Sequence, residues 1–362
     1  MKHKLSIVLL LLLFLAGCAA APGQPLPSST APVTEAPVTE PPSYFEVHYL
    51  DVGQADATLI VCDGEYLLLD GGDTSDSSLL YAYLKNLGAD RLRYVICSHV
   101  HRDHIGGLAG ALNYASADTV FCPTREYDSD EFRNLRKYLT CPITVPSAGD
   151  VFSLGSAECN ILAVNTQPDH PNNSSIVLKI RYGDTSFLFS ADAEQAVEQF
   201  ILDAGKDISC TVLKVPHHGS DSSLSDAWLS AARPQYAVIS CGKDNAYSHP
   251  APSTLEKLQG LGIPVYRTDL HGHIILRSNG RDVTVEVQKN SQADPFVPPQ
   301  APLPPDTLSP AQDYVLNHNT EVFHHPNCTS ADKILEKNRE DVTASREELI
   351  ARGFSPCGNC HP

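Results

Sequence analysis

Hydrophobic and polar residues alternate in short runs between residues 44 and 289, and this pattern predicts β-strands that alternate with helices. The apolar runs are rich in Val, Ile, Leu and aromatic residues, and turns containing Gly separate the first three. We predict strands at 45–50, 57–61, 65–70, 92–97, 174–181, 186–189, 210–215 and 236–240, and a helix at 77–87. The pattern indicates an α/β fold, in which several strands end at loops rich in His and Asp, as at functional sites.

The amino end has a different pattern. Lys2 and Lys4 precede an apolar run at 5–15, which is too short to cross a membrane as a mature helix and predicts an export signal at 1–18. The residues Leu-Ala-Gly-Cys that end at Cys18 resemble a bacterial lipobox, which implies a lipid on Cys18 and an extracytoplasmic, membrane-anchored protein. An ordinary secretory peptide is the alternative. Residues 19–44 are rich in Pro, Thr and Ser and predict a disordered tether.

Composition and charge narrow the class of protein. The chain has 362 residues, of which 42% are hydrophobic and 19% charged, as expected for a folded globular protein. Its net charge is −17 and no segment after the leader is basic, which argues against nucleic-acid binding through Lys and Arg alone. A second Pro-rich segment predicts a linker at 291–308, between a domain at 45–290 and a small domain at 309–362.

The densest chemical pattern follows the strand predicted at 92–97. It reads Ser98-His99-Val100-His101-Arg102-Asp103-His104-Ile105-Gly106-Gly107. We expect the side chains of His99 and His101 to project to one side of the strand end, and Asp103 and His104 to lie in the next helix. Imidazole and carboxylate groups bind zinc, manganese and iron, so the spacing predicts a centre that holds two metals. The two Gly residues would allow a tight turn beside it; the alternative is a surface loop without metal.

With this pattern the chain resembles the metallo-β-lactamase-fold hydrolases and, within them, the soluble hydrolase domain of ComEC-type competence proteins. LDVGQADA at 50–57 is similar to that family's DVGQGD segment, with Ala55 in place of Gly. Other similar segments are LLDGG at 68–72, Asn172 with Ser175, SADAE at 190–194 with Ala191 in place of Gly, KVPHHGS at 214–220 and NAYSHP at 245–250. The resemblance covers residues 45–290 and implies an αββα sandwich.

The resemblance also implies which residues hold two divalent metals, Zn or Mn. His99 and His101 would bind one metal. A second metal would be bound by Asp103, His104 and His249, and Asp192 would bridge the two. The third ligand of the first metal stays open, because His170 is the only nearby candidate and could equally be a loop residue before Pro171. No nucleotide cofactor is expected.

For catalysis, the resemblance implies phosphodiester hydrolysis by a hydroxide that the two metals activate. Asp103 or Asp192 would accept the proton. His217 and His218 would donate to a phosphoryl or leaving-group oxygen. The alternative for one of the two, with His217 the first candidate, is that it only holds its loop by hydrogen bonds. Lys214 is the candidate cation for a phosphate, and the alternative is a strand lysine that snorkels to solvent.

Other polar residues are expected to act indirectly. We predict that three carboxylates near the site orient metal ligands or hold the backbone: Asp51, Asp56 and Asp70. A structural role is predicted for Thr268, Asp269 and Gly272. Of the 11 cysteines, Cys122 and Cys141 flank a polar helical stretch and could form a disulfide.

The tail contains a second candidate metal site. His324, Cys328, Cys357 and Cys360 have a zinc-compatible spacing. The tail resembles the small Ada-type metal-binding domain, with His324 where the parent family has Cys. Because a domain of this size has little core, we predict a structural zinc in a small α+β domain. A disulfide between two of the three Cys is the alternative.

The sequence therefore predicts an exported, lipid-anchored, monomeric two-metal hydrolase with DNA as its substrate. A first alternative is a phosphodiesterase that acts on a small or wall-linked ester such as phosphorylcholine, which the acidic charge favours. A second alternative, from another class, is a DNA- or envelope-binding protein whose metal site is silent. Intact histidine and aspartate motifs argue against this last possibility.

Overall fold

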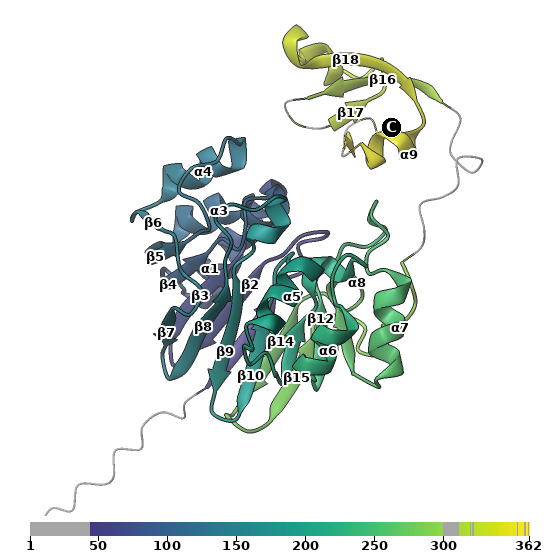
Figure 1. Cartoon of the computed structure of the whole chain (residues 1–362). Helices are drawn as coiled ribbons and strands as arrows, with labels where there is room; N and C mark the ends of the chain where they lie inside the picture. Colours follow the sequence, from purple (N-terminus) through teal and green to yellow (C-terminus); the bar gives the residue numbers. More distant parts are fainter. Residues whose placement is uncertain are drawn as a thin grey trace, which may run out of the picture. The chain divides into compact units, whose positions relative to one another are not determined.

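The computed structural model describes residues 44–299 and 311–362, apart from positions 319, 321, 353, 358, 359 and 361. Two β-sheets pack face to face in residues 44–299, and helices cover the outer face of each sheet (Figure 1). The αββα sandwich that the sequence predicted is confirmed. The predicted leader, nearly all of the predicted tether and residues 300–308 of the predicted linker lie outside the described residues, so the domain boundaries stay predictions.

The first sheet has eight strands in the order β15-β14-β1-β2-β3-β4-β5-β6. Strands β3 to β6 run parallel, and the other neighbours pair antiparallel. The bounds are β1 Phe45–Tyr49, β2 Thr58–Cys62, β3 Glu65–Leu69, β4 Arg91–Ile96, β5 Ser116–Phe121, β6 Ile143–Thr144, β14 Ile274–Ser278 and β15 Val283–Val287.

The second sheet has seven strands in the order β13-β12-β11-β10-β9-β8-β7. Here β10 to β13 run parallel and the others antiparallel. The bounds are β7 Val151–Leu154, β8 Ala157–Ala163, β9 Val177–Tyr182, β10 Thr185–Phe189, β11 Val212–Lys214, β12 Tyr236–Ile239 and β13 Val265–Arg267. The strand predicted at 174–181 begins later, because a 3-10 helix (η2, Pro171–Ser174) precedes it.

The central strands of each sheet are buried on both faces, which explains why they read as almost continuous apolar runs, whereas the edge strands β7 and β15 are partly exposed. Side chains alternate between the faces of a strand. In β2, Ile60 faces the core between the sheets, while its neighbour Leu59 faces the helices. In β10, Phe187 lies in the core between the sheets and Leu188 under the helices of the second sheet.

Helices α1, α3 and α4 contribute to the core outside the first sheet, and α5, α6 and α7 to the core outside the second. The predicted helix at 77–87 is α1, with the predicted bounds. The bounds are α1 Ser77–Leu87, α2 Arg102–Ile105, α3 Leu108–Tyr114, α4 Asp130–Tyr138, α5 Gln195–Asp203, α6 Asp226–Ala232, α7 Pro252–Gly260 and α8 Thr268–His271. Short 3-10 helices are η1 Thr74–Asp76 and η3 Pro216–Gly219.

The cysteines of these two sheets are thiols that mostly pack as small apolar groups. Cys97 and Cys122 are buried in the core outside the first sheet, and Cys141 is half-buried. No disulfide joins any of the cysteines that the structure describes, so the bridge considered between Cys122 and Cys141 is not formed.

Residues 311–362 contain a sheet of their own, in the order β18-β16-β17-β19. A small core of Tyr314, Leu316, Phe323 and Leu349 lies beside it. The bounds are β16 Gln312–Asn317, β17 Val322–His324, η5 Ala331–Lys333, η6 Glu336–Asn338, β18 Arg339–Ala344, α9 Arg346–Ala351 and β19 Ser355–Pro356. Across the described parts of the chain, no helix has the length and apolar character needed to cross a membrane.

The Gly pair after α2 packs directly against the backbone that follows β3. A Cβ atom at Gly107 would lie 2.1 Å from the carbonyl oxygen of Gly71, and one at Gly106 would lie 2.4 Å from the amide nitrogen of Thr74. Only glycine allows this approach, which brings the His104 segment next to Asp70.

We therefore expect Gly107→Ala to lower the free energy of unfolding by roughly 1–3 kcal/mol, because backbone would have to move to admit the methyl group. The matched control is Gly260→Ala, where nothing lies within 4 Å of the added Cβ. Chemical denaturation of the full chain measures both. Equal midpoints for the two variants would contradict the close packing.

Candidate metal centre

The site is organised around the carboxylate of Asp70, which is buried at the end of β3. Asp70 Oδ1 accepts a hydrogen bond from the Ser98 amide at 2.8 Å, and Oδ2 accepts from Ser98 Oγ at 2.6 Å. Its Oδ2 also lies 2.9 Å from His104 Nδ1. A proton on Nδ1 satisfies this contact and leaves the lone pair of His104 on Nε2, as in many metal-binding histidines.

His104 Nε2 points into a group of four ligand atoms that lie within 4.8 Å of one another, contributed by Asp103, His104, Asp192 and His218. Asp192 Oδ2 is 3.2 Å from His104 Nε2 and 3.7 Å from His218 Nε2. Asp103 Oδ2 is 3.3 Å from His218 Nε2. His104 Nε2 and Asp192 Oδ1 are buried and make no hydrogen bond, so the donor set fits a divalent metal.

His99 and His101 lie beside this group, and the His99 ring packs against the His104 ring with centroids 4.1 Å apart. His99 Nε2 and His101 Nδ1 are 3.1 Å apart, and His99 Nε2 lies 3.9 Å from Asp192 Oδ2. Oδ2 of Asp192 is therefore close to both histidine groups. This is the arrangement expected of a carboxylate that bridges two metals.

A backbone carbonyl orients the ring of His218, as Asp70 orients that of His104. His218 Nδ1 lies 3.0 Å from the carbonyl oxygen of Ser240, which can only accept a hydrogen bond, so Nδ1 carries a proton. Nε2 then faces two carboxylates. His217 and His218 both have left-handed backbone conformations, with φ of 49° and 53°. Such strain in bulky residues is typical of functional sites.

The structure does not place His249 in the group of four, where the sequence analysis had put it; His218 takes that position. Gln54 Nε2 donates to His249 Nδ1 at 3.4 Å, and Gln54 Oε1 accepts from the Gly242 amide. The His249 ring lies 5.6 Å from the His217 ring, centroid to centroid. The repeated His in KVPHHGS, directly after a parallel strand, was the signal that could have identified His218.

His170 is exposed, and its ring centroid lies 6.1 Å from that of His101. Its Nδ1 accepts a long hydrogen bond of 3.3 Å from the Asn172 amide. His170 therefore lies beside the first histidine pair without joining a group of ligands. Its role as a third ligand stays a prediction.

Lys214 does not reach a substrate position, contrary to its prediction as a catalytic cation. Its side chain is buried in β11, and its ammonium forms an ion pair with Asp56. A lysine that is buried and paired in this way holds the structure, so Lys214 does not snorkel to solvent either, as the alternative interpretation had it. Asp56 Oδ1 also lies 3.5 Å from His218 Nδ1, so the carboxylate places negative charge beside this histidine.

The field of the site favours ionised carboxylates. Burial opposes ionisation of Asp192, but the His104 and His218 rings outweigh it and hold its pKa well below the usual value. Burial likewise opposes protonation of His104, yet the carboxylates of Asp192, Asp70 and Asp103 raise its pKa. Positive charge is thus stabilised where the two rings meet the carboxylates, and a divalent cation can replace the proton there.

The other predicted supporting residues separate into two groups. Asp51 is near the surface and pairs with Lys289 at 2.9 Å, so it does not contact the candidate ligands. Thr268 Oγ1 bonds the backbone of Cys241, and Asp269 accepts two hydrogen bonds from the buried Arg267. These contacts agree with the structural roles predicted for them.

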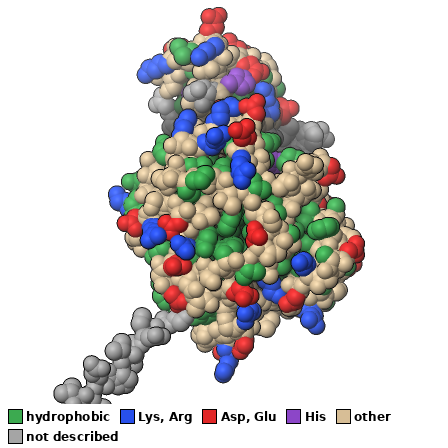
Figure 2. Space-filling model, turned by 60° about the vertical axis from the view of Figure 1, so that its left-hand side comes forward, with side chains coloured by type: hydrophobic (Ala, Val, Ile, Leu, Met, Phe, Trp, Pro, Cys, Tyr) green, Lys and Arg blue, Asp and Glu red, His purple; other side chains and the backbone are tan. Residues whose placement is uncertain are grey.

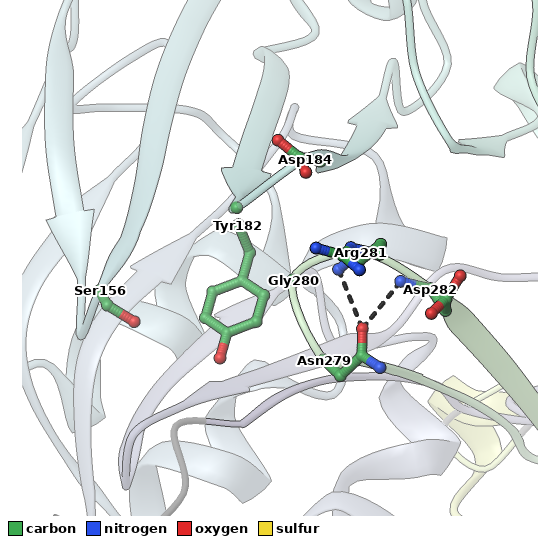
Figure 3. A pocket seen from close by; sticks show the side chains of 8 residues that line it. Ser156, Tyr182, Asp184, Asn279, Gly280, Arg281 and Asp282 are labelled. Atoms are coloured by element: carbon green, nitrogen blue, oxygen red, sulfur yellow. Dashed lines mark hydrogen bonds between the residues drawn. The ribbon is translucent and has the colours of Figure 1, made fainter.

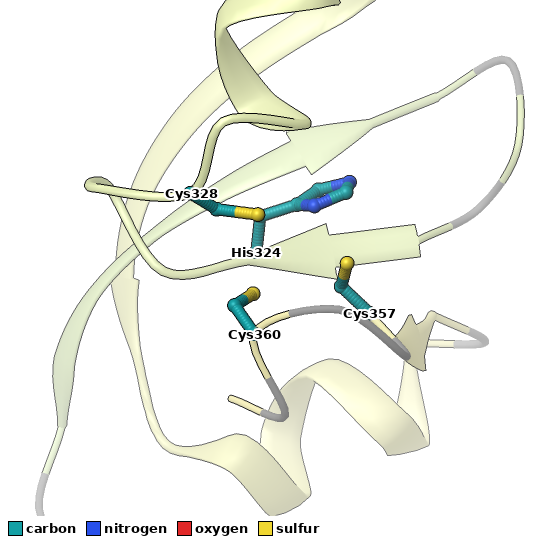
Figure 4. Close-up of side chains that lie close together, drawn as sticks. All are labelled: His324, Cys328, Cys357 and Cys360. Carbon is teal, nitrogen blue, oxygen red and sulfur yellow. The ribbon is translucent and has the colours of Figure 1, made fainter.

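The tail brings together its four predicted ligands, whose ligand atoms also lie within 4.8 Å of one another (Figure 4): His324, Cys328, Cys357 and Cys360. The His324 Nδ1 is buried without a hydrogen-bond partner. The Cys357 amide donates to the carbonyl of Phe323 at 2.9 Å, which fixes Cys357 beside β17. One imidazole and three thiols fit a structural zinc.

A further cavity of about 570 Å³ is separate from both groups of ligands (Figure 3). It is lined by Tyr182 at the end of β9 and by residues of the neighbouring turns, among them Asp184 and Arg281. Asn279 Oδ1 accepts hydrogen bonds from the backbone amides of Arg281 and Asp282 there, so these polar groups are paired within the turn. None of the predicted metal or catalytic residues lines this cavity.

Comparison with known proteins agrees with this centre. Residues 50–243 match the profile described as the Metallo-beta-lactamase superfamily, which is more than half of the chain. The chain belongs to this superfamily of metal-dependent hydrolases. Within it, the chain is related to competence proteins.

Two relatives illustrate the relationship. ComE operon protein 3 of Bacillus subtilis is 30% identical over 264 residues, which are 67% of this chain and 34% of the relative. Recombination protein 2 of Haemophilus influenzae is 32% identical over 253 residues, which are 68% of this chain and 30% of the relative. The chain thus spans about a third of the length of these proteins.

Among solved structures, the metallo-beta-lactamase fold protein YhfI from Bacillus subtilis is similar, with 13% identity and a TM-score of 0.45. The similarity covers 65% of this chain and all of YhfI.

Asp70→Asn is expected to weaken metal binding about 10- to 100-fold, because an amide cannot accept all three hydrogen bonds and turns a donor towards His104 or Ser98. Asp51→Asn, which removes a carboxylate outside the site, should leave metal affinity unchanged. Competition titration against a fluorescent chelator measures both. Equal affinities for the two variants would show that Asp70 does not orient the ligands.

His218→Asn should lower the metal retained after dialysis by roughly one equivalent, while His249→Asn should retain the wild-type amount. The asparagine at position 218 can still donate a hydrogen bond to the Ser240 carbonyl. The variant should therefore stay folded and lose only the metal ligand. Elemental analysis and thermal melting of the full chain test this pair. The opposite ranking would restore His249 as the ligand.

Proposed function

We propose that this protein is an extracytoplasmic, lipid-anchored phosphodiesterase that hydrolyses DNA. The observation that carries the proposal is the position of Asp192, which belongs to the group of four ligands and whose Oδ2 also lies 3.9 Å from Nε2 of His99 in the first histidine pair. The lipobox-like sequence at Cys18 supports the location. The relationship to competence and recombination proteins supports DNA as the substrate.

Divalent metals bound by these residues would supply the activated water and stabilise negative charge on the phosphoryl oxygens. Asp103 is the carboxylate of the group with access to solvent, since its side chain is 33% exposed. We assign it the role of accepting the proton from water. Asp192, whose side chain is 3% exposed, is suited to holding charge in place rather than exchanging protons with solvent.

His217 is the ring best placed to donate a proton. Its side chain is 21% exposed, and its Nε2 lies 3.7 Å from Asp192 Oδ2. Its Nδ1 lies 3.0 Å from Ser222 Oγ. Its Nε2 also lies 3.5 Å from Asn172 Nδ2, which can only donate, so the ring would donate to a phosphoryl or leaving-group oxygen when both of its nitrogens are protonated.

The acidic surface supports the second candidate, a phosphodiesterase for a small or wall-linked ester such as phosphorylcholine. The net charge is −17, and acidic and basic side chains are interspersed over the face seen in Figure 2. Such a surface does not attract a polyanion by itself. The shared ligand centre serves either substrate equally well.

Metal-dependent cleavage of labelled single- or double-stranded DNA by the full chain is the expected result, with manganese or zinc and not with chelator. Asp103→Ala should lower the rate about 100-fold or more, because it removes both a ligand and the proposed proton acceptor. Asp51→Asn is the matched control and should cleave like the wild type.

Bis-p-nitrophenyl phosphate provides the contrasting substrate. Turnover of this small diester with DNA left intact would replace the DNA proposal by the small-ester candidate. DNA binding that persists without cleavage, unchanged by chelator or by Asp103→Ala, would indicate the binding protein with a silent metal site.

A further inference from the structure

Tyr247 lies next to the candidate metal centre with most of its ring in solvent. It is 70% exposed, the largest exposed fraction among the large hydrophobic side chains that the structure describes. Isolated exposed apolar residues are common, so exposure alone carries no meaning. Tyr247 differs from the other exposed apolar side chains in its position beside the centre and in the rigidity of its loop.

The Tyr247 ring stacks on the His249 ring, with centroids 5.7 Å apart and an interplanar angle of 27°. The His249 ring in turn packs edge to face with the His217 ring, with centroids 5.6 Å apart. Nε2 of His217 is 3.7 Å from Asp192 Oδ2. Two imidazoles therefore separate the tyrosine ring from the proposed bridging carboxylate. This spacing puts Tyr247 at the rim of the centre, within reach of a group attached to the reacting phosphate.

The loop that carries Tyr247 is fixed from below by the buried side chain of Asn245. Asn245 Oδ1 accepts hydrogen bonds from the amides of Tyr247 and His249, at 3.1 and 3.0 Å. Its Nδ2 donates to the carbonyls of Gly242 and His249. One face of the Tyr247 ring lies on His249, and Asn245 holds the loop. Little conformational entropy is therefore lost when a planar group binds to the other face of the ring.

We propose that Tyr247 is a stacking platform for an unpaired nucleobase beside the scissile phosphate, and that the preferred substrate is therefore single-stranded DNA. This inference rests on the proposed function. Bases of any sequence can stack on an aromatic ring, whereas bases within a duplex already stack on their neighbours. Stacking also needs no positive charge, which suits a chain with a net charge of −17.

A quaternary ammonium group is the competing occupant, since it can bind to the face of a tyrosine. Sites for such cations surround them with an aromatic cage. Among the described residues, the ring contact recorded for Tyr247 is with His249 alone. A single open ring face fits a base better than a choline headgroup.

The test compares Tyr247→Leu, Tyr247→Phe and the control Tyr127→Leu in the full chain. Tyr127 is also an exposed tyrosine, but it lies beside Phe132 outside the centre. With oligodeoxythymidine as substrate, we expect Tyr247→Leu to raise KM roughly tenfold with little change in kcat. Tyr247→Phe and Tyr127→Leu should behave like the wild type. Metal content and melting temperature show that each variant is folded and loaded.

An abasic oligonucleotide of the same length completes the experiment. The wild type should have a raised KM for it, and Tyr247→Leu should add no further increase. An unchanged KM for oligodeoxythymidine in Tyr247→Leu, or an equal loss in Tyr247→Phe, would overturn the stacking role while leaving the nuclease intact. A selective loss with p-nitrophenyl phosphorylcholine would identify the cation as the occupant. Failure of the wild type to cleave any DNA would instead overturn the proposed function.

Discussion

The buried carboxylate of Asp70 accepts hydrogen bonds from Ser98, after β4, and from His104, in α2. A carboxylate removed from water is tolerated only when such bonds compensate for its lost hydration. These hydrogen bonds join the end of β3 to the segment that carries the histidines. They also fix which nitrogen of His104 faces the group of ligands. Gly106 and Gly107 make this possible, because any side chain there would push the two backbones apart. Fold stability and ligand orientation therefore depend on the same contacts.

Backbone strain is concentrated in the same region. His217 and His218 are left-handed, and so is Ala191, with φ of 46°. The family pattern has Gly at position 191, which the positive φ explains. Each such residue costs on the order of 1–3 kcal/mol. The cost is offset locally, since the His217 amide donates to the carbonyl of Ala191 at 2.8 Å and His218 is held by Ser240.

Sequence patterns predicted the layers and the segments of the site because both follow from local rules. Apolar runs predict strands buried on both faces, and the HxHxDH run contains its ligands within the short segment from His99 to His104. The assignment of His218 and His249 could not be predicted in this way. Both follow strands of the second sheet, and only the carbonyl of Ser240 and the amide of Gln54 decide which ring enters the ligand group. Lys214 is a similar case, because its partner Asp56 is distant in sequence.

Charge is the remaining constraint on what the centre can bind. Asp103 and Asp192 approach each other through the shared histidines, and the nearby ammonium of Lys214 is already paired with Asp56. The charge of Lys214 is thus not available to attract a phosphate. Bound cations would then supply the catalytic charge and much of the attraction for an anionic substrate. Affinity beyond that has to come from contacts that do not depend on charge, and an exposed aromatic ring at the rim is such a contact.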